Sequence, residues 1–281
     1  MAIDSKDNSA LDRRDDRKAA GEDQNGKAQE PWSVEQVVEG IPGGPPQTDS
    51  SSPVPFFHML ERLKTTKREG WRRFGIAHGE SISDHMYRMA MITMFAPPAL
   101  AAKINVPHCT KMALVHDMAE ALVGDITPVD GIPKPEKNRR ESTTMDYFTN
   151  SLLGRVNGGM TGKQIRDVWQ EYEDNETMNA KFVHDVDKIE LILQMVEYER
   201  VHETKLDLGE FTWVATRIEL AEVKAWSDDL MEEREVFWGD KKHTRFDTEE
   251  ALKAATAKEV DTEKLVKEHV GYYGDGKSTF Q

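Results

Sequence analysis

The chain has 281 residues, and its 51 aspartates and glutamates outnumber its 37 lysines and arginines, giving a formal net charge of −14. Its longest unbroken apolar runs are only a few residues, far short of the ~20 that cross a bilayer, which excludes a membrane-spanning protein. The negative charge repels a phosphate backbone at long range and disfavours binding to a nucleic-acid polymer, although a local site for one small phosphate remains compatible with it.

The chain has one cysteine, Cys109. A single cysteine allows no internal disulfide and no cysteine-rich zinc site, and it suits a reducing compartment. The N-terminus has no apolar stretch of the kind that a secretory signal requires. We therefore expect a cytoplasmic protein, with the nucleus as the alternative.

Both ends of the chain are polar. Residues 1–52 finish in a serine- and proline-rich stretch and offer too little apolar surface to offset the entropy lost on ordering. We predict a disordered tail there, with a short helix near Trp32–Val38. Residues 239–281 are highly charged, and we predict a C-terminal extension with one further helix after Asp247.

The residues between these ends carry helical periodicity. Apolar positions recur every three to four residues in segments separated by proline or glycine, and convincing strand-like alternation is absent. The expected helices cover 54–67, 82–102, 107–123, 134–155, 161–174, 177–204 and 210–237. We predict an all-α fold in which residues 53–238 form a single globular domain, a size that one hydrophobic core supports.

One of these expected helices carries polar residues in an apolar setting. From Met112 to Val123, every residue is apolar except His116, Asp117 and Glu120. On a regular helix Glu120 lies ~40° and Asp117 ~100° around the axis from His116, so the three share one sector. A helix that is apolar nearly all round is buried, and ionised carboxylates in such a place need compensation. The pattern favours ligands of a divalent metal; the alternative is a buried His–Asp pair with Glu120 bonded to backbone or arginine.

Further ligands for a metal are sought among the other histidines and acids. His85 follows a capping-box pattern, Ser81–Asp84, and shares a face with Met89 and Ile92, which predicts that its ring points inward.

A second His-Asp pair, His184 and Asp185, lies with Lys188 on one polar side of a helix, most simply a solvated face. Asp187 lies nearly opposite, between apolar positions, and is the better candidate for a buried ligand.

Several motifs carry a family resemblance. They are Glu80–Ala90, Ala113–Glu120, Val123–Pro128, Ile132–Lys137, Ala180–Val183 with Asp187–Lys188, and Gln194 through Glu199. Together they resemble the HD-domain metal-dependent phosphohydrolases, and in particular the eukaryotic HD domain-containing protein 2 group, relatives of the bacterial 5′-deoxynucleotidases. The similarity covers roughly residues 53–238 and implies an HD-domain helical bundle.

The resemblance also implies a ligand set. The ligands of the first metal would be His85, His116, Asp117 and Asp187. Glu120 matches an acidic residue that the family needs for catalysis, either for proton transfer or as a ligand of a second metal. Asp125 and the backbone carbonyl of Ile126 match a loop that contacts that second metal or the substrate sugar. The family favours Mn²⁺, Co²⁺ or Mg²⁺, and the donor set also suits Zn²⁺ or Fe²⁺.

The substrate residues follow from the same resemblance. Arg68 would orient the phosphate as part of the catalytic machinery, Trp71 would stand near the deoxyribose and exclude a 2′-hydroxyl, and Thr127, with Asp125, would touch the nucleotide. The bacterial relatives have arginine directly before the tryptophan, whereas here two residues intervene, as in the eukaryotic group.

The implied activity is that of a phosphoric monoester hydrolase, a 5′-deoxynucleotidase that converts a deoxyribonucleoside 5′-monophosphate to deoxynucleoside and phosphate. Related proteins form homodimers, and we expect one here. Two alternatives stay open. One is another HD-type phosphohydrolase, acting on a cyclic nucleotide, a dNTP or an alarmone. The other is a non-catalytic helical interaction module that keeps the metal as a structural element.

Overall fold

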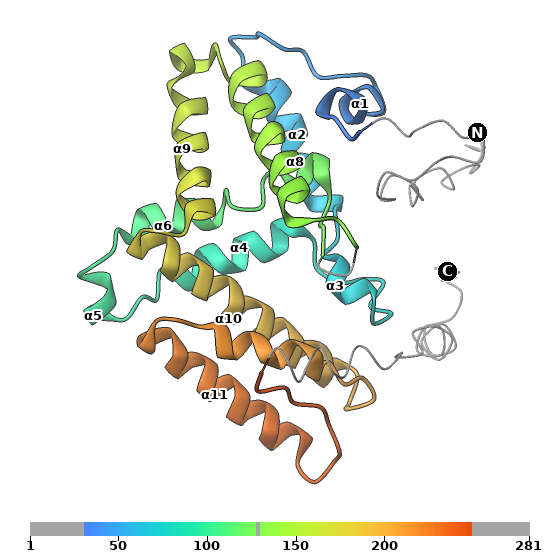
Figure 1. The fold of residues 1–281 in the computed structure, drawn as a ribbon, viewed down its shortest axis with the longest axis vertical. Helices are drawn as coiled ribbons and strands as arrows, with labels where there is room; N and C mark the ends of the chain where they lie inside the picture. The colour runs from blue at the N-terminus through green and yellow to red at the C-terminus, as the bar shows by residue number, and fades with distance from the viewer. Residues whose placement is uncertain (1–30, 128–129, 249–281) are drawn as a thin grey trace, which may run out of the picture.

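The structure, a computed structural model, describes residues 31–127 and 130–248. These residues form α-helices joined by short connections (Figure 1). The helices are α1 (Val34–Glu39), α2 (Val54–Thr65), α3 (Glu69–Arg72), α4 (Ile82–Thr93), α5 (Pro98–Ala101), α6 (Val106–Ala113), α7 (Glu120–Val123), α8 (Lys134–Asp146), α9 (Met160–Asp174), α10 (Met178–Val201) and α11 (Ala221–Trp238). The predicted all-α fold is confirmed for this part of the chain.

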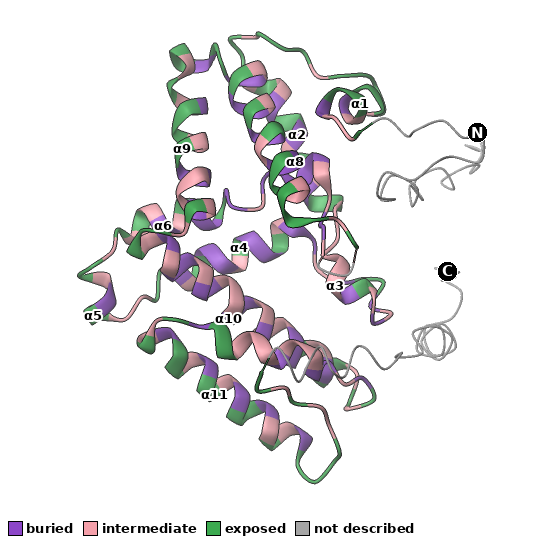
Figure 2. Cartoon of the chain, viewed as in Figure 1, coloured by how far each residue is buried: buried purple, intermediate pink, exposed green. Residues whose placement is uncertain are grey.

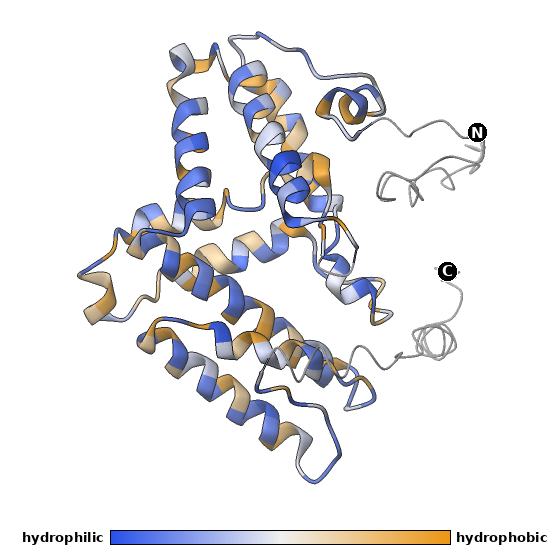
Figure 3. Ribbon diagram, in the orientation of Figure 1, coloured by the Kyte–Doolittle hydropathy of each residue, from blue (hydrophilic) through white to orange (hydrophobic). Residues whose placement is uncertain are grey.

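Helix α4 lies at the centre of the bundle. It packs on α6, α10 and α2, and α10 in turn packs on α6, α9 and α11, so that α11 forms an outer layer beneath α10 (Figure 1). The buried segments run along α4 and α10 (Figure 2), whereas α9 is largely hydrophilic (Figure 3). None of the described helices combines the length and the apolar character that crossing a bilayer would take.

The start of α4 is fixed by the predicted capping box. The backbone N–H of Asp84 donates to Ser81 Oγ at 3.2 Å, and the backbone N–H of Ser81 donates to Asp84 Oδ2 at 2.8 Å. An isolated antiparallel bridge between Lys67 and Ser81 ties the chain before α3 to this cap. Together the cap and the bridge set the position of the residues that follow them on α3 and α4.

The predicted N-terminal tail is too long. Residues 1–30 lie outside the described residues, but residues 31–52 belong to the packed structure, because α1 contacts α7 and α8 and buries Val34 and Val38. The short helix predicted near Trp32–Val38 is confirmed. Trp32, Val37 and Ile41 also pack against the core, so several apolar side chains dock this short helix, and the polar composition around them concealed this.

Three predicted helices are interrupted, and the break in the one expected over 107–123 lies between α6 and α7. The helix expected over 82–102 ends at Thr93 and resumes as the short helix α5, because a residue that precedes a proline is disfavoured in helical conformation. The helix expected over 210–237 divides into a 3₁₀ segment, Gly209–Arg217, and α11. The helix expected over 134–155 is α8, which continues as a π-helical turn over Tyr147–Leu152.

The first residues of the predicted C-terminal extension pack on the domain. The backbone N–H of Thr244 donates to Asp207 at 2.6 Å, and that of Phe246 donates to the Thr212 hydroxyl at 2.7 Å. A Cβ atom on Gly209 would lie 2.1 Å from the Thr244 carbonyl oxygen, so this close approach requires glycine. We therefore propose that the domain reaches beyond residue 238. The helix predicted after Asp247 lies outside the described residues.

A buried ion pair joins α10 to α11. Glu199 and Arg234 are both 0% exposed, and Arg234 donates from Nε and Nη2 to the two carboxylate oxygens at 2.8 and 2.9 Å. The Trp238 ring N–H and the backbone N–H of Leu208 also donate to Glu199, each at 2.8 Å. The carboxylate is therefore fully satisfied, and removing one partner leaves a buried charge without compensation.

Replacing Arg234 with methionine is expected to lower the free energy of unfolding by about 3–5 kcal/mol, because Glu199 stays buried without its cation. Urea denaturation followed by circular dichroism measures this. Arg200→Met is the matched control: the Arg200–Glu233 pair is exposed on both sides, and its loss is expected to cost less than about 1 kcal/mol. Equal effects of the two substitutions would contradict the prediction.

Candidate metal centre

The segment Met112–Val123, which carries His116, Asp117 and Glu120 among apolar residues, is not one continuous helix. Helix α6 ends at Ala113 and α7 begins at Glu120, and between them the backbone N–H groups of Val115 and Met118 bond to the carbonyl three residues earlier. Such bonds wind the chain more tightly than an α-helix. Apolar residues continue through the turn, so the sequence pattern did not reveal it. His116 and Asp117 therefore project from a tight turn, and the angles of a helical wheel do not apply to them.

His85 points inward from α4, as predicted. Its side chain is 0% exposed, and its Nδ1 lies 2.5 Å from Glu190 Oε2 on α10. Its Nε2 lies 3.2 Å from Asp187 Oδ1 and 3.8 Å from Asp117 Oδ2. Since a carboxylate only accepts, Nδ1 carries the proton that bonds to Glu190, and Nε2 faces the two other carboxylates.

His116 shows the same division of roles. Its Nδ1 lies 3.0 Å from the backbone carbonyl of Ala113, which also only accepts, and its Nε2 lies 3.1 Å from Asp117 Oδ2. Both Nε2 atoms are buried, and neither has a hydrogen-bond partner among the described residues. Two buried imidazole nitrogens that lack a hydrogen-bond partner and are turned toward carboxylates are arranged as a metal site requires.

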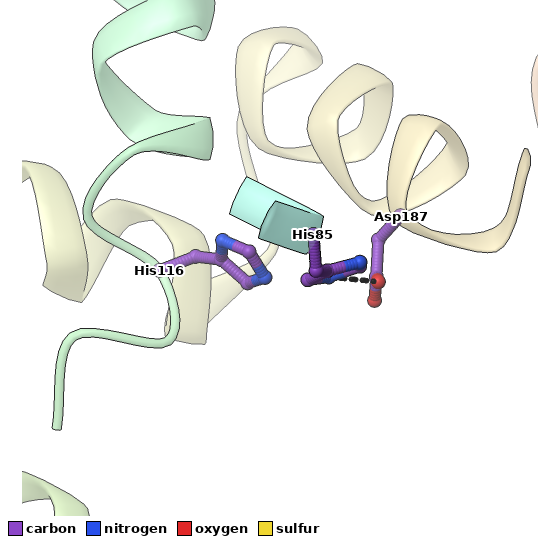
Figure 4. Close-up of side chains that lie close together, drawn as sticks. All are labelled: His85, His116 and Asp187. Carbon is purple, nitrogen blue, oxygen red and sulfur yellow. Dashed lines mark ion pairs between the residues drawn. The ribbon is translucent and has the colours of Figure 1, made fainter. Parts of the chain in front are cut away.

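The candidate ligands come together from three separate elements. Figure 4 shows His85, His116 and Asp187 with their side chains directed to a common point, and one ligand atom of each lies within 4.8 Å of the others. Asp117 Oδ2 lies within 3.8 Å of both Nε2 atoms. Two imidazoles and two carboxylates suit Mn²⁺, Fe²⁺, Co²⁺ or Zn²⁺, so the residues present fit a divalent cation.

The charges at this point perturb one another. Burial and the neighbouring Arg68 by themselves lower the pKa of His85, but Glu190 and Asp187 outweigh them and raise it to about 10. Burial raises the pKa of Asp187 and Asp117, yet the histidines beside them lower both values well below the usual range. In the absence of a metal, an imidazolium at His85 therefore supplies the positive charge that the carboxylates require.

Glu120 and Asp125 flank this cluster. Glu120 is buried, and its Oε2 has no hydrogen-bond partner among the described residues. Burial, followed by the charges of Asp117 and Asp125, raises the pKa of Glu120 well above its usual value. Asp125 accepts the backbone N–H of Glu69 at 2.6 Å, and the next residue, Ile126, is also buried. A buried carboxyl that holds its proton is suited to proton donation.

Arg68 reaches the same cluster from the chain before α3. Its Nη1 lies 3.3 Å from Asp117 Oδ2, and its backbone N–H bonds to the Glu80 carbonyl at 3.2 Å. Burial by itself lowers the pKa of Arg68, but the carboxylates of Asp125 and Asp117 raise it well above the usual value. The guanidinium is therefore a fixed positive charge at the edge of the predicted ligand set.

Two predicted substrate residues make hydrogen bonds within the protein. Trp71 is only 2% exposed: its ring N–H donates to Glu80 at 2.8 Å, and its ring packs on Phe211 at a centroid distance of 4.7 Å. Its ring therefore lies inside the protein, in contact with Glu80 and Phe211. The Thr127 hydroxyl donates to Asp130 at 2.8 Å, and its backbone N–H donates to the same oxygen, so both groups shape the turn.

Comparison with known proteins agrees with this geometry. The HD domain family matches residues 60–226, which is more than half of the chain. The chain belongs to the HD domain family. It is 47% identical over 189 residues to 5′-deoxynucleotidase hdd1 of Schizosaccharomyces pombe, covering 67% of this chain and 93% of that protein. It is 42% identical over 144 residues to human 5′-deoxynucleotidase HDDC2, covering 51% of this chain and 67% of that one.

Solved structures show the same HD-domain fold. The HD domain-containing protein YGK1, whose Saccharomyces cerevisiae counterpart is named a 5′-deoxynucleotidase, superposes with a TM-score of 0.53 at 29% identity, covering 73% of this chain and 93% of that one. A conserved hypothetical protein from Pyrococcus furiosus has a TM-score of 0.52 at 25% identity, covering 65% of this chain and 99% of the other.

The sequence interpretation missed or misplaced three residues of this HD domain. Asp185, read as part of a solvated face, is fully buried and accepts the backbone N–H groups that lead into α11, at Glu219 and Leu220. Glu190, which holds His85, was not considered, although a glutamate one turn beyond Asp187 on a largely apolar helix was a usable signal. Tyr172, whose hydroxyl lies 3.4 Å from Asp187 Oδ2, gave no signal in the sequence.

Binding of Mn²⁺ to this HD domain is expected to release a proton, because His85 is protonated below a pKa of about 10 and a ligand nitrogen must be neutral. Affinity should therefore rise with pH between about 6.5 and 8.5, by up to about tenfold per unit. Calorimetry in buffers of different ionisation enthalpy measures both quantities. Binding without proton release, at an affinity independent of pH, would contradict the assignment of His85.

Proposed function

We propose that this HD-domain protein is a metal-dependent 5′-deoxynucleotidase, which hydrolyses 2′-deoxyribonucleoside 5′-monophosphates to deoxynucleoside and phosphate. The observation that carries the proposal is the pair of buried, unpartnered Nε2 atoms of His85 and His116, turned toward two carboxylates with Arg68 beside them. The names of relatives at 40–47% identity support the reaction.

The cation would be held by His85, His116, Asp117 and Asp187. The family resemblance favours Mn²⁺, Co²⁺ or Mg²⁺, and the donor set also suits Zn²⁺ or Fe²⁺. When bound, a divalent ion lowers the pKa of water and neutralises phosphoryl oxygens, which are the two needs of a very slow hydrolysis.

Arg68 would hold the phosphate. Its planar guanidinium donates two parallel hydrogen bonds to a phosphoryl group, a geometry that lysine does not provide. In the structure, Arg68 Nη1 lies 3.3 Å from Asp117 Oδ2, and a bound phosphate would share or replace that contact. The position of Arg68 next to a predicted metal ligand supports a phosphate site at the ligand set.

Glu120 would move the proton. The departing O5′ needs one, and a buried carboxyl with its pKa well above the usual value retains a proton to donate. The alternative is that Glu120, Asp125 and the Ile126 carbonyl bind a second cation, in which case another group or water is the acid. The nucleotide contacts predicted for Trp71 and Thr127 stay predictions, and burial of Trp71 argues for an indirect role through Glu80.

The proposal is tested by stripping the protein of metal, restoring Mn²⁺, Co²⁺, Mg²⁺ or Zn²⁺ separately, and measuring phosphate release from dAMP and AMP. We expect no activity without metal, restored activity with Mn²⁺, Co²⁺ or Mg²⁺, and faster release from dAMP. Activity that survives chelation would overturn the metal dependence, and equal rates would overturn the 2′-selectivity. Pyrophosphate or triphosphate release from a dNTP would favour another HD-type phosphohydrolase.

Glu120→Gln separates its two roles in the same assay. As a proton donor, Glu120 should be needed for kcat, and its amide variant should lose about 10²–10⁴-fold while binding the same number of metal ions. Loss of one metal equivalent would instead identify Glu120 as a ligand. If the wild-type protein binds metal but hydrolyses no nucleotide, the result would favour the alternative of a non-catalytic interaction module with a structural metal.

We also propose a homodimer formed through the outer face of α4. Tyr87 and Met91 lie four residues apart on α4, and Met94 and Phe95 follow just beyond its end. Tyr87 and Phe95 are 65% and 71% exposed, and Met91 and Met94 are 39% and 55% exposed. A net charge of −14 opposes self-association through other, charged surfaces, so an uncharged apolar face is where two copies can meet. Light scattering should give the mass of a dimer for the wild type and of a monomer for Tyr87→Glu/Phe95→Glu; a monomeric wild type would contradict this.

A cytoplasmic location agrees with the state of the one cysteine. Cys109 is a free thiol and is buried. Burial raises the pKa of this thiol to about 12, which keeps it protonated and unreactive. The chain thus has no cysteine chemistry that an oxidising compartment would use, and we propose that it resides in the cytoplasm, with the nucleus as the alternative.

A further inference from the structure

Behind His85 lies a buried carboxylate that the proposed mechanism does not use. Glu190 on α10 is 0% exposed. Its Oε2 lies 2.5 Å from His85 Nδ1, and its Oε1 accepts from Arg88 Nε at 2.9 Å and from Arg88 Nη2 at 2.7 Å. The two oxygens thus serve two different donors, and α4 supplies both of them, since His85 and Arg88 are one turn apart.

Arg88 makes further hydrogen bonds to α10. Its Nη1 donates to Glu197 at 2.6 Å, and its Nη2 also donates to Gln194 at 2.7 Å. Together with Glu190, three residues of α10 therefore bind the guanidinium. Arginine has only donors and a carboxylate has only acceptors. With Oε1 committed to Arg88, Oε2 faces His85, so in the neutral ring the proton lies on Nδ1.

We propose that Glu190, held by Arg88, is a positioning residue that keeps the His85 proton on Nδ1 and so leaves Nε2 free to bind the metal. This inference rests on the proposed metal centre. The inference concerns the tautomer of His85 and not only the direction of its ring. A ring with the proton on Nε2 would fill the same space but would present a hydrogen atom where the cation must bind. The carboxylate also makes Nε2 a stronger donor to the metal.

Glu190→Gln tests this assignment, because an amide has one acceptor and one donor end. Two N–H groups of Arg88 donate to this side chain, so the amide oxygen should stay turned to Arg88 and the NH₂ group should face His85. An NH₂ group only donates, so His85 Nδ1 would have to accept, and the ring proton would move to Nε2. We expect Zn²⁺ and Mn²⁺ affinity, measured by calorimetry, to fall roughly 10–100-fold. The ¹⁵N shifts of His85 in the metal-free variant at high pH should report a proton on Nε2.

Rescue distinguishes this role from general damage to the site. In the Glu190→Gln background, Arg88→Met removes the competing donors, and the amide is free to turn its oxygen to His85. The double variant should therefore bind metal more tightly than Glu190→Gln alone. If Glu190 only fills space or holds the helices together, a second lost contact should weaken binding further. A double variant weaker than the single one would overturn the proposal.

A matched control exists elsewhere in the chain. His108 Nε2 lies 2.6 Å from Glu171 Oε2, a histidine–glutamate pair on α6 and α9 that includes no predicted ligand. Glu171→Gln should leave metal affinity within about twofold, because no ligand changes its tautomer. A loss equal to that of Glu190→Gln would show that the effect comes from stability rather than from His85.

The position of the His85 proton can also be measured in the wild-type protein, so this test does not depend on the folding of a variant. When it is loaded with diamagnetic Zn²⁺, His85 should show a proton on Nδ1 with a strongly downfield ¹H shift, as a hydrogen bond of 2.5 Å to a carboxylate requires. A proton on Nε2 overturns the inference. Failure of the wild type to bind any metal would instead overturn the proposed function, so the two failures are distinguishable.

Discussion

Two buried histidines and two partly buried aspartates meet at one point. Two carboxylates, Asp117 and Asp187, face two imidazole nitrogens on His85 and His116, away from most of the solvent. Burying such charges is costly unless a cation compensates them. The arrangement is therefore stable only with a positive charge at its centre, either a metal ion or a protonated His85, and the packing of the bundle serves to hold α4, α10 and the turn before α7 at the distances this requires.

The orientation of the two histidines depends on groups one step further from the metal. His116 is held by the carbonyl of Ala113, which the end of α6 leaves in reach of the ring. His85 is held by Glu190, and Glu190 by Arg88. One ring is thus fixed by a helix end and the other by a buried ion pair. A backbone carbonyl cannot be lost by substitution, whereas a side-chain carboxylate can, so the His85 side of the site depends more on particular residues.

The rim of the site is coupled to the outer layer of the fold. The bridge between Lys67 and Ser81 aligns the segment that carries Arg68 with the cap of α4, so that the guanidinium and His85 are placed by one local structure. Trp71 follows on α3 and packs on Phe211 of the 3₁₀ segment, which residues 244–246 in turn hold through Thr212. Segments far apart in the chain therefore support the side of the site that carries Arg68.

The sequence by itself determined what depends on near neighbours. It determined the helical class, the cap that turns His85 inward, and the polar residues within the apolar run around His116, because period and capping act within a few residues. It did not separate Asp185 from Asp187 by burial: Asp185 is fully buried, whereas the Asp187 side chain is 31% exposed. Only the tertiary structure decided the break at 114–119, the docking of α1, the burial of Trp71 and the contact of Glu190 with His85. Each of these depends on packing against atoms distant in the chain, and that packing overrides local preference without leaving a periodic trace in the sequence.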